Sequence, residues 1–513
     1  MVERHNLGDL IDRSLDKPAL IDLGADGPPR ILSFRQLDDE CAAVARALTA
    51  RGLQPGDRIA ILSANRSEYL SAYFGIMRAG FVAVPVNHRF PKALTDFALA
   101  DSGAKLVFCD AACLAACPED LPAVVFGPAV ASRASQQIPF DAFLDPGPFE
   151  SVVPQGDAPA MFLYTSGSTG KPKGVVLSHR SHLWIVAARL AGQDLARHRY
   201  LIAAPLYHMN ALALSKLTIA AGATTVLLPQ FSSRAYIEAI ERYRCTWLTA
   251  VPPMIAMMLR ETQQLDNTDL SSVAFLRMGS APVTSSLLAA IHRRMPNVKV
   301  INAFGSTEGG PVVFGPHPQG LEQPLISVGC AHPLVELRLV QGENLNAEQG
   351  VLQIRSPGVM TGYHNRPDLR APFTDDGYLI TGDVFRRDED GFYYFVGRAD
   401  DMFVCGGENV YPGEVEMLLE SYPGIAQACV VPVDDEIKGQ KPMAFCVPSE
   451  GAVLHESDVK AFALEHGPAY RHPRAVWFLE KLPLSATNKI DRSALQEIAA
   501  SRLSRRENQP TKS

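Results

Sequence analysis

Apolar positions near the start of the chain follow two spacings in turn. Leu37, Cys41, Val44 and Leu48 recur at helical intervals, and the short apolar run "DRIAILSAN" follows them. The next segment, "SEYLSAYFGIMRAG", again has helical spacing with Ser67 placed as its N-cap, and it leads into the strand pattern "FVAVPVN". This alternation predicts strands that are joined by crossover helices.

The same alternation returns further along the chain. Its segments are "ATTVLLPQ", a helical pattern over 233–244, "TWLTAVPP", the helical "SSLLAAIHRRM" and the strand "KVINAFGS". Repeated strand–helix units favour layers of helices packed on largely parallel sheets. We therefore predict an α/β fold for this part of the chain.

The pattern changes near residue 326 and again near residue 400. First come short strands such as "ELRLV", "GVLQIRS" and "EDGFYYFVG", separated by Gly and Asp-Gly. Later, the helical "GEVEMLLESY" mixes with the strands "ACVVPV" and "MAFCVP". The predicted parts are a large N-terminal domain of α/β layers over 1–399, a small β-rich subdomain within it over 326–399, a smaller mobile α+β C-terminal domain over 400–500, and a disordered tail over 501–513.

Composition narrows the class of protein. The chain has 513 residues, of which 47% are hydrophobic and 20% are charged, as in an ordinary soluble globular protein. Such a length exceeds what one core supports, so at least two domains are expected. A net charge of −7 argues against nucleic acid as the main partner. Small molecules are the expected partners, and a homodimer is left open.

The cysteines and the apolar runs bear on location. The nine cysteines are scattered and no secretory signal pattern precedes them, which favours free thiols and a cytoplasmic protein. No apolar run reaches the roughly 18 residues that a membrane-spanning helix needs. We expect no membrane span.

Two groups of side chains have spacings that resemble metal sites. Cys109, Cys113 and Cys117 stand four residues apart, but no fourth ligand is nearby and cysteine is a common buried residue. His179 and His182 stand three apart without an acidic or cysteine partner. We interpret both groups as structural.

The run "YTSGSTGKPKGVVLSH", residues 164–179, points to chemistry. Glycines and hydroxyls let successive backbone N–H groups surround phosphate oxygens. The loop is not a Walker A motif, because only two residues separate Gly167 from Gly170 and Pro172 follows Lys171. A mobile hairpin that binds nucleotide phosphates is the prediction, and a loop without chemical purpose is the alternative.

Six motifs in order extend this prediction. They are "TSGSTGKPKG", "PLYHMNAL", "NAFGSTEGG", "YLITGD", "GRADDMFVCGGENVYPGEVE" and "PLSATNK". In order and spacing they resemble the adenylate-forming superfamily of acyl-CoA synthetases, peptide-synthetase adenylation domains and firefly luciferase, from about Phe34 to Arg492. The resemblance implies an ATP-dependent acyl-CoA ligase that uses a carboxylic acid, ATP, Mg²⁺ and CoA. Acyl-AMP and pyrophosphate form first, and the acyl group then passes to the thiol.

The resemblance also assigns roles at the nucleotide. Thr307 would donate to the α-phosphate, and Thr165 and Glu308 would ligate Mg²⁺. Asp383 and Arg398 would grip the ribose hydroxyls. Phe304 and the small residues of "GSAP" would flank the adenine, and the glycine-rich loop would hold the β- and γ-phosphates. The nucleotide-binding positions are Thr165, Ser166, Gly167, Ser168, Thr169, Gly170, Lys173, Gly279, Ser280, Ala281, Asn302, Phe304, Gly305, Asp383 and Arg398.

The C-terminal motifs imply a lysine that acts in the first step and a hinge. Lys489, in "PLSATNK", would bridge the carboxylate and the α-phosphate, although Asn488 stands where the family most often has glycine. Asp400 would be the hinge about which the C-terminal domain turns between steps. His208 would gate the acyl pocket and the thiol tunnel. Gly406, Gly407 and Glu408 would form the path of the pantetheine arm of CoA.

The acid itself is less defined. Met209 stands where amino-acid-activating relatives place an aspartate, so a buried substrate ammonium would lack a counter-ion. The expected pocket favours an aromatic or medium-chain aliphatic acid. Arg277 would favour a dicarboxylate such as malonate if it entered the pocket; we expect it instead to form a structural ion pair. The expected pocket residues are Met209, Asn210, Ala211, Val251, Pro253, Met254, Met278 and Val312.

Two other functions remain as alternatives. A stand-alone adenylating enzyme would load an acyl carrier protein in place of CoA. A relative without catalysis would sense AMP or act as a scaffold, but intact Lys489, Glu308 and Thr307 argue against it.

Overall fold

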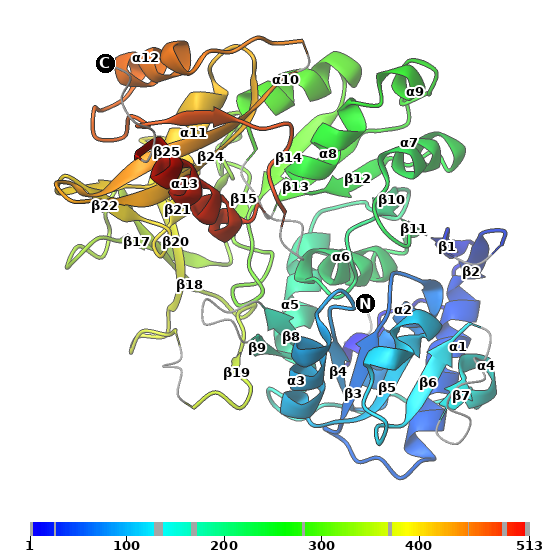
Figure 1. The fold of residues 1–513 in the computed structure, drawn as a ribbon. Coiled ribbons are helices and arrows are strands. Elements are labelled where there is room, and N and C mark those ends of the chain that lie inside the picture. The colour runs from blue at the N-terminus through cyan, green and yellow to red at the C-terminus, as the bar shows by residue number, and fades with distance from the viewer. Residues whose placement is uncertain are drawn as a thin grey trace.

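The computed structural model describes residues 4–24, 27–127, 137–165, 172–279, 283–367, 372–449, 451–484 and 490–507. Two large sheets with helices between and outside them form the main body, and a smaller α+β region lies beside it (Figure 1). The predicted fold class is confirmed. Within the described residues, no helix is long and apolar enough to span a bilayer.

An eight-stranded sheet forms one layer, in the order β19-β9-β8-β4-β3-β5-β6-β7. The strands from β8 to β7 in this order pair in parallel, whereas β9 pairs antiparallel with both β8 and β19. Its strands are β3 (Arg58–Leu62), β4 (Val82–Pro85), β5 (Ala104–Asp110), β6 (Ala123–Phe126), β7 (Gln137–Pro139), β8 (Pro159–Thr165), β9 (Lys173–Ser178) and β19 (Gly362–Tyr363).

A seven-stranded sheet forms the second layer, in the order β14-β13-β12-β10-β11-β1-β2. All neighbours pair in parallel except β1 and β2. Its strands are β1 (Pro18–Asp22), β2 (Arg30–Ser33), β10 (Arg199–Ile202), β11 (Thr224–Leu227), β12 (Trp247–Ala250), β13 (Phe275–Gly279) and β14 (Lys299–Ala303).

Helices fill the space between the sheets and cover their outer faces. One buried cluster joins residues of both sheets to α1, α2, α5 and α6, so these helices form the middle layer. A second cluster packs α7, α8 and α10 on the outer face of the seven-stranded sheet. The helices of the body are α1 (Phe34–Thr49), α2 (Ser67–Arg78), α3 (Lys92–Ser102), α4 (Phe140–Phe143), α5 (His179–Leu190), α6 (Met209–Ala220), α7 (Ser233–Arg242), α8 (Pro252–Leu259), α9 (Thr262–Asp266) and α10 (Ser285–Arg294), with 3-10 turns η1 (Leu7–Asp9) and η2 (Ala111–Ala116).

Side chains alternate between the two faces of the seven-stranded sheet. Tyr200 and Trp247 belong to the inner cluster, whereas their neighbours Leu201 and Leu248 belong to the outer one. Both faces are apolar because helices cover both. This alternation determines which strand residues face α5 and α6.

The start of α2 differs from the prediction. Ser67 is the first residue of the helix and Arg66 is the N-cap, without a side-chain capping hydrogen bond. The Asp22 carboxylate takes over that function, because its Oδ2 accepts a hydrogen bond from the Ser67 backbone N–H at 2.7 Å. An acceptor that is 45 residues distant cannot be seen in the local pattern.

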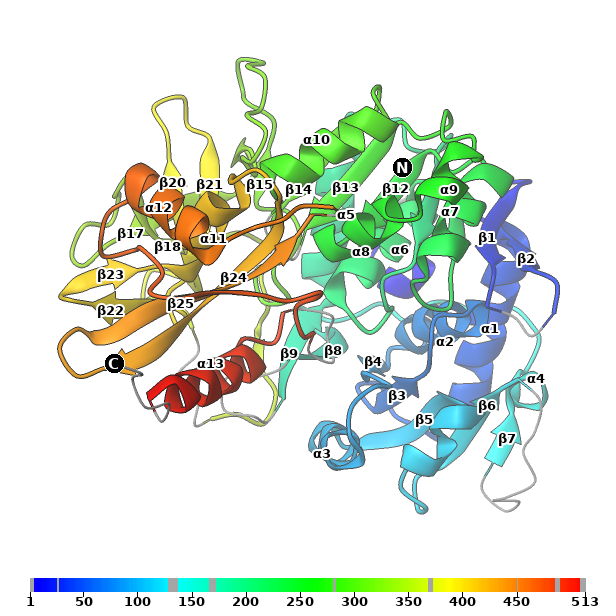
Figure 2. The ribbon, with the colours of Figure 1, turned by 45° about the horizontal axis from the view of Figure 1, so that its top comes forward.

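A β-rich region and an α+β region follow the two large sheets. Figure 2 shows both beside β14, the edge strand of the seven-stranded sheet. The β-rich part contains β15 (Phe314–Gly315), β16 (Cys330–Ala331), β17 (Glu336–Val340), β18 (Gln349–Arg355), β20 (Leu379–Arg387) and β21 (Tyr393–Arg398). The last part contains β22 (Phe403–Cys405), β23 (Glu408–Val410), α11 (Pro412–Glu420), β24 (Ile425–Asp435), β25 (Gly439–Pro448), α12 (Glu456–His466), β26 (Val476–Phe478) and α13 (Arg492–Glu507).

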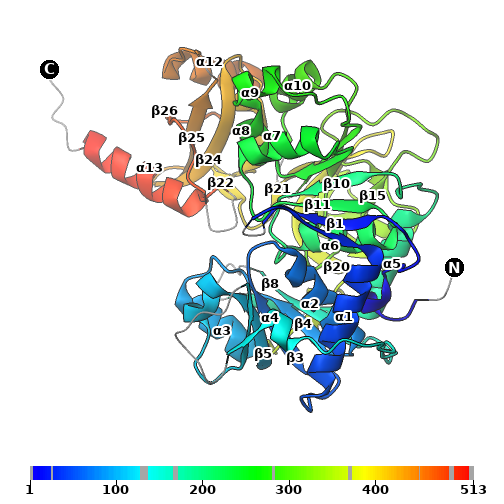
Figure 3. The same ribbon diagram turned by 90° about the vertical axis from the view of Figure 1, so that its right-hand side faces the viewer.

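The proposed domain border near residue 400 falls between β21 and β22. These two strands belong to different sheets, since β21 pairs with β20 and β22 pairs with β23 and β25. Helix α13 lies against the C-terminal region (Figure 3) and runs to Glu507, past residue 501, where we expected a disordered tail to begin. Residues 508–513 lie outside the described part.

Candidate functional site

The carboxyl ends of β13 and β14 lie side by side. Gly279 pairs with Ala303 in register, and both strands end at this edge of the sheet. A Cβ on Gly279 would stand 2.6 Å from the Ala303 carbonyl oxygen, so only glycine fits. Open parallel sheets bind ligands at such carboxyl ends. Ser280 and Ala281, which we expected beside the adenine, lie outside the described residues.

The turn after β14 carries several of the expected residues. Asn302 donates through Nδ2 to the carbonyls of Ile326, at 3.0 Å, and Ser327, at 3.3 Å, so its amide holds the start of the β-rich region. The Phe304 ring packs edge-on against Phe385, with centroids 4.9 Å apart. Gly305 allows the backbone of Gly310 to approach, since a Cβ there would lie 2.9 Å from that carbonyl oxygen. Thr307 and Glu308 follow on this turn, both half-buried.

The glycine-rich segment connects β8 and β9. Thr165 and Lys173 form the last pair of this antiparallel ladder, as a hairpin requires. The two strands of the predicted hairpin are therefore present. Ser166, Gly167, Ser168, Thr169 and Gly170, within the loop itself, lie outside the described residues.

Tyr363 connects the β8–β9 strand pair to Glu308. Its hydroxyl donates to Glu308 Oε1 at 3.2 Å, and Lys173 Nζ lies 5.4 Å from the centroid of its ring. Burial and the neighbouring Glu308 carboxylate raise the pKa of Tyr363, which keeps it a donor. The sequence did not identify Tyr363, because its position depends on β19 pairing with β9 almost 190 residues earlier.

Asp383 and Arg398 face each other on β20 and β21, as we expected of a pair. They are partners in register, with Arg398 Nη1 3.0 Å from Asp383 Oδ1. Arg398 also donates to both oxygens of Asp400, at 2.9 and 3.1 Å. Burial disfavours the guanidinium charge, but Asp400 and Asp383 outweigh it and raise the pKa of Arg398. The proposed ribose pair and the proposed hinge are therefore one network.

The proposed hinge residue, Asp400, also interacts electrostatically with Lys173 of the β8–β9 hairpin. Burial favours the neutral form of Asp400, but the hydrogen bonds and charge of Arg398, together with the charge of Lys173, lower its pKa. Lys173, Asp400 and Arg398 thus lie within electrostatic reach of one another, although 225 residues separate the first from the last. Through Tyr363 and Glu308, the arrangement places these charged groups near the turn that follows β14.

His208 occupies the N-cap position of α6, and its ring lies 4.5 Å from that of Tyr207. The first residues of α6, Met209, Asn210 and Ala211, therefore start beside it. This helix packs in the middle layer, on the inner face of the seven-stranded sheet.

The expected pocket residues do not all meet. Met209 and Ala211 belong to the inner cluster, Met254 and Met278 to the outer one, and Val312 to a third under the β-rich region. Met278 is fully buried and leaves no surface for a ligand. Val251 packs against the outer cluster and Pro253 is half-buried on α8.

Arg277, the residue before Met278, lies on the inner face instead. Its Nη1 donates to Asn210 Oδ1 at 3.3 Å. Among the described residues, no carboxylate forms the ion pair that we expected for it. Arg277 therefore reaches the start of α6, beside the expected acyl pocket.

The predicted CoA residues form an exposed turn between β22 and β23. Gly406 and Gly407 have φ of +63° and +91°, which favour glycine, and a Cβ on either would meet nothing within 4 Å. Glu408 follows, also exposed. The Gly406 N–H donates to the Lys438 carbonyl at 2.9 Å, so the turn rests on the β24–β25 hairpin.

Lys489 lies outside the described residues, but both ends of its segment are held. Leu484 and Ile490 form an antiparallel bridge that closes the segment. Arg492 then donates to Glu416 on α11 through Nη1 at 2.7 Å and Nη2 at 2.9 Å. The segment is thus anchored to the C-terminal region.

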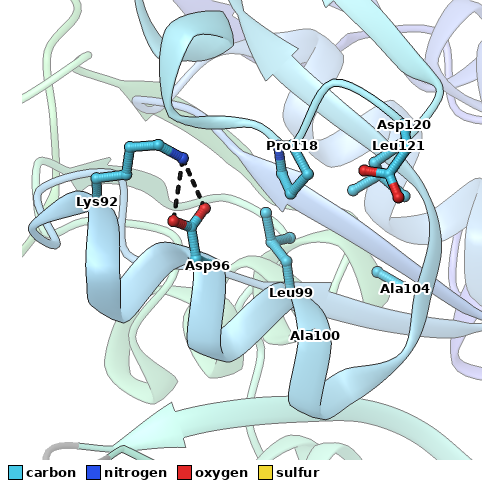
Figure 4. A pocket seen from close by; sticks show the side chains of 8 residues that line it. All are labelled: Lys92, Asp96, Leu99, Ala100, Ala104, Pro118, Asp120 and Leu121. Carbon is cyan, nitrogen blue, oxygen red and sulfur yellow. Dashed lines mark hydrogen bonds and ion pairs between the residues drawn. The ribbon is translucent and has the colours of Figure 1, made fainter.

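Two other features lie apart from this edge. An open hollow of about 500 Å³ lies between α3 and the loop before β6, where Lys92 pairs with Asp96 (Figure 4). None of the predicted site residues lines it. His182 Nδ1 lies 3.0 Å from the fully buried Lys216 Nζ, and His179 Nδ1 accepts from the Leu7 N–H at 3.1 Å, so both histidines have structural contacts.

Comparison with known proteins adds independent information. The family model "AMP-binding enzyme" matches residues 10–364, and "AMP-binding enzyme C-terminal domain" matches residues 414–489. A feruloyl-CoA synthase from Amycolatopsis sp is 34% identical, covering 90% of this chain and 92% of the relative. An indoleacetate–CoA ligase from Aromatoleum aromaticum is 33% identical, covering 92% and 94%. The crystal structure of an anthranilate CoA ligase with anthranoyl-AMP superposes with a TM-score of 0.85 at 25% identity, covering 97% of this chain and 98% of the other.

Proposed function

The chain belongs to the AMP-binding enzyme family, as an AMP-forming acid–CoA ligase, and from that membership we propose that it activates an aromatic carboxylic acid and transfers it to CoA. ATP and CoA are the substrates that this family implies. The observation that best supports the chemistry is the gathering of Glu308, Lys173, Asp383 and Arg398 beside the carboxyl ends of β13 and β14.

The chemical problem is crowded negative charge. A carboxylate must attack the α-phosphate of ATP, and both reactants are anions. Fixed cations and N–H donors aimed at the phosphates are the largest catalytic contribution available. In our proposal the β8–β9 hairpin, closed by Thr165 and Lys173, surrounds the leaving pyrophosphate, and Thr307 donates to the α-phosphate.

The residues fit a magnesium ion, which the family implies. Glu308 presents a half-buried carboxylate that Tyr363 holds through Oε1, and no cation pairs with it among the described residues. Mg²⁺ prefers one or two carboxylates together with phosphate oxygens. We propose that Glu308 and the Thr165 hydroxyl hold the ion, which would neutralise phosphate charge.

The nucleoside would bind at the turn that follows β14. Gly279 and Gly305 let neighbouring backbone pack closely at this edge, and Phe304 supplies an aromatic side chain there. Asp383, whose side chain is 9% exposed and is oriented by Arg398, would accept hydrogen bonds from the ribose hydroxyls. Because Arg398 also binds Asp400, ribose binding and hinge position are coupled in this proposal.

The C-terminal region would supply a different group for each step. Lys489 would neutralise charge between the acid and the α-phosphate during adenylation. The region would then turn at Asp400 and bring the exposed turn of Gly406, Gly407 and Glu408 to the same place for the pantetheine arm. Such domain movements often limit turnover.

An aromatic acid is the substrate class that the relatives support, since their names give ferulate, indoleacetate and anthranilate. Apolar residues at the start of α6, Met209 and Ala211, agree with this class. An α-amino acid would require a carboxylate at Met209, which is absent there.

The experiment is an ATP-dependent screen of benzoates, cinnamates, indole acids, fatty acids and dicarboxylates, with AMP and pyrophosphate measured with and without CoA. We expect aromatic acids to give CoA-dependent AMP release and a thioester. Pyrophosphate release that needs a carrier protein, with CoA inert, would support the carrier-loading alternative. Activity confined to long-chain fatty acids would contradict the aromatic assignment.

A further inference from the structure

Two guanidinium groups lie on the inner face of the seven-stranded sheet. Arg277 extends from the middle of β13 and Arg189 from the last turn of α5, and both are half-buried. Within the described part of the chain, no carboxylate lies within ion-pair distance of either. Arg277 binds a neutral amide, that of Asn210. Burial and then the like charge of Arg189 lower the pKa of Arg277 to about 9.

Without a bound anion, two neighbouring guanidinium groups without a counter-ion destabilise the folded protein. Removing a charge from water is costly unless an opposite charge or several hydrogen bonds replace the water. The charge that acts on the pKa of Arg277, that of Arg189, has the same sign. Groups held in so unfavourable an environment are commonly functional.

Arg277 lies on the strand that leads to the expected nucleotide-binding edge. Arg277 is on the same face as Phe275, which packs against the inner cluster beneath α5 and α6. It is also two residues before Gly279, where the nucleotide is expected. Two strand residues span about 7 Å, which suits a group at the far end of a small acid.

Further donors lie on this face. The Tyr200 hydroxyl and the Trp247 Nε1 are buried, and neither has a hydrogen-bond partner among the described residues. The two rings stack with centroids 5.0 Å apart, and Trp247 stacks on Phe275 at 4.4 Å. Tyr200 is close enough to Arg189 to influence its pKa. Indole and guanidinium groups are donors only and the tyrosine hydroxyl can also donate, so this set offers several donors to an anion.

Building on the proposed function, we propose that the substrate carries a second anionic group, a carboxylate or a sulfonate, which binds between Arg277 and Arg189 at the inner end of the acyl pocket. An aromatic ring between the two acid groups would lie beside the start of α6, on the Gly279 side of Arg277. The second group supplies the counter-ion that the two arginines lack. The enzyme would then discriminate against uncharged analogues.

The test compares isophthalate and 3-sulfobenzoate with 3-methylbenzoate, which has similar size but no second charge. Wild-type kcat/KM should be higher for the dianions. Arg277→Met and Arg189→Met should each lower kcat/KM for the dianions by about 10²-fold, because the partner group is then left unpaired. Their kcat/KM for 3-methylbenzoate should stay the same or rise. Arg180→Gln, an exposed arginine on α5, is the matched control.

The outcomes separate this inference from the proposed function. A wild-type enzyme that uses 3-methylbenzoate or ferulate but neither dianion overturns this inference alone. An enzyme that adenylates no aromatic acid contradicts the proposed function. If either variant fails to fold, thermal shift of the wild-type protein decides: isophthalate should raise Tm more than 3-methylbenzoate, and equal shifts would overturn the inference.

Discussion

Tyr363 holds the one carboxylate that we assign to magnesium. Its hydroxyl donates to Glu308 Oε1 at 3.2 Å, which fixes the orientation of the carboxylate. Groups that orient a metal ligand typically change metal affinity by about 10–100-fold when they are removed. Tyr363→Phe should therefore raise the Mg²⁺ concentration for half-maximal pyrophosphate release by about tenfold. The ring remains, so stability should change little.

Tyr378→Phe is the control for this prediction, because Tyr378 also donates to a glutamate, Glu336, but on the exposed β-rich region. It should leave the Mg²⁺ requirement unchanged. An unaltered Mg²⁺ requirement in Tyr363→Phe would exclude Tyr363 from this role.

Lys216 is a second residue whose environment makes a quantitative prediction. Burial lowers its pKa from 10.5 to about 7, and no carboxylate pairs with it among the described residues. Between these pKa values the unfolded chain binds the proton and the folded protein releases it. The free energy of unfolding therefore rises with pH across the window from about 7 to 10.5, and the full penalty is present below pH 7.

Lys216→Met removes the free-energy cost of burying this ammonium group. The variant should be more stable than the wild type at pH 7, and its advantage should shrink by about 1.4 kcal/mol per pH unit toward pH 10. Urea denaturation at pH 7, 8 and 9 measures it. Lys92→Met, at an exposed ion pair, should show no such pH dependence. A variant that is less stable than the wild type at pH 7 would mean that the contacts of Lys216 outweigh its desolvation.

At the scale of elements, α13 begins directly after the segment that contains Lys489. Arg492, its first residue, donates to both oxygens of Glu416 on α11 and lies 3.9 Å from Asp401, next to the proposed hinge. Burial opposes its charge, but Glu416 outweighs burial and raises the pKa of Arg492. This contact fixes the start of α13 and with it one end of the lysine segment.

Arg492→Met should release that end. Misplacement by about 1 Å can cost 10²-fold in rate, so we expect adenylation to fall by at least tenfold. Acyl transfer from supplied acyl-AMP should fall less. Arg471→Met, which breaks the ion pair with Glu414 on the same helix, should retain adenylation. Equal losses in both half-reactions would indicate general destabilisation of the region.

Elements with regular apolar spacing were predictable from the sequence. The predicted strand "DRIAILSAN" contains β3. The helices predicted from the spacing of Leu37 to Leu48 and in "SSLLAAIHRRM" are α1 and α10. Contacts between distant segments were not predictable. The pairing of β19 with β9 brings Tyr363 to Glu308, and the Asp22 carboxylate replaces the expected Ser67 cap. The face on which Arg277 lies also depends on strand register, which places Met278 in the outer cluster.

At the scale of the whole molecule, we propose that one region, the C-terminal region, serves both half-reactions. The Asp383–Arg398–Asp400 network connects the proposed ribose-binding pair to the border of the C-terminal region. The motifs predicted Asp383 and Arg398 as a pair and Asp400 as a separate hinge, whereas the structure joins all three through Arg398. Lys489 and the Gly406–Gly407 turn both belong to the C-terminal region, so a single rotation would exchange one for the other.

The most direct test of this account measures the two half-reactions in Lys489→Ala. Loss of one charge contact to the transition state should lower acid-dependent ATP–pyrophosphate exchange by about 10²–10³-fold or more. Thioester formation from supplied acyl-AMP and CoA should stay near the wild-type rate. Pyrophosphate exchange at the wild-type rate in this variant would contradict the central claim, that a lysine of the C-terminal region neutralises the charge of adenylation.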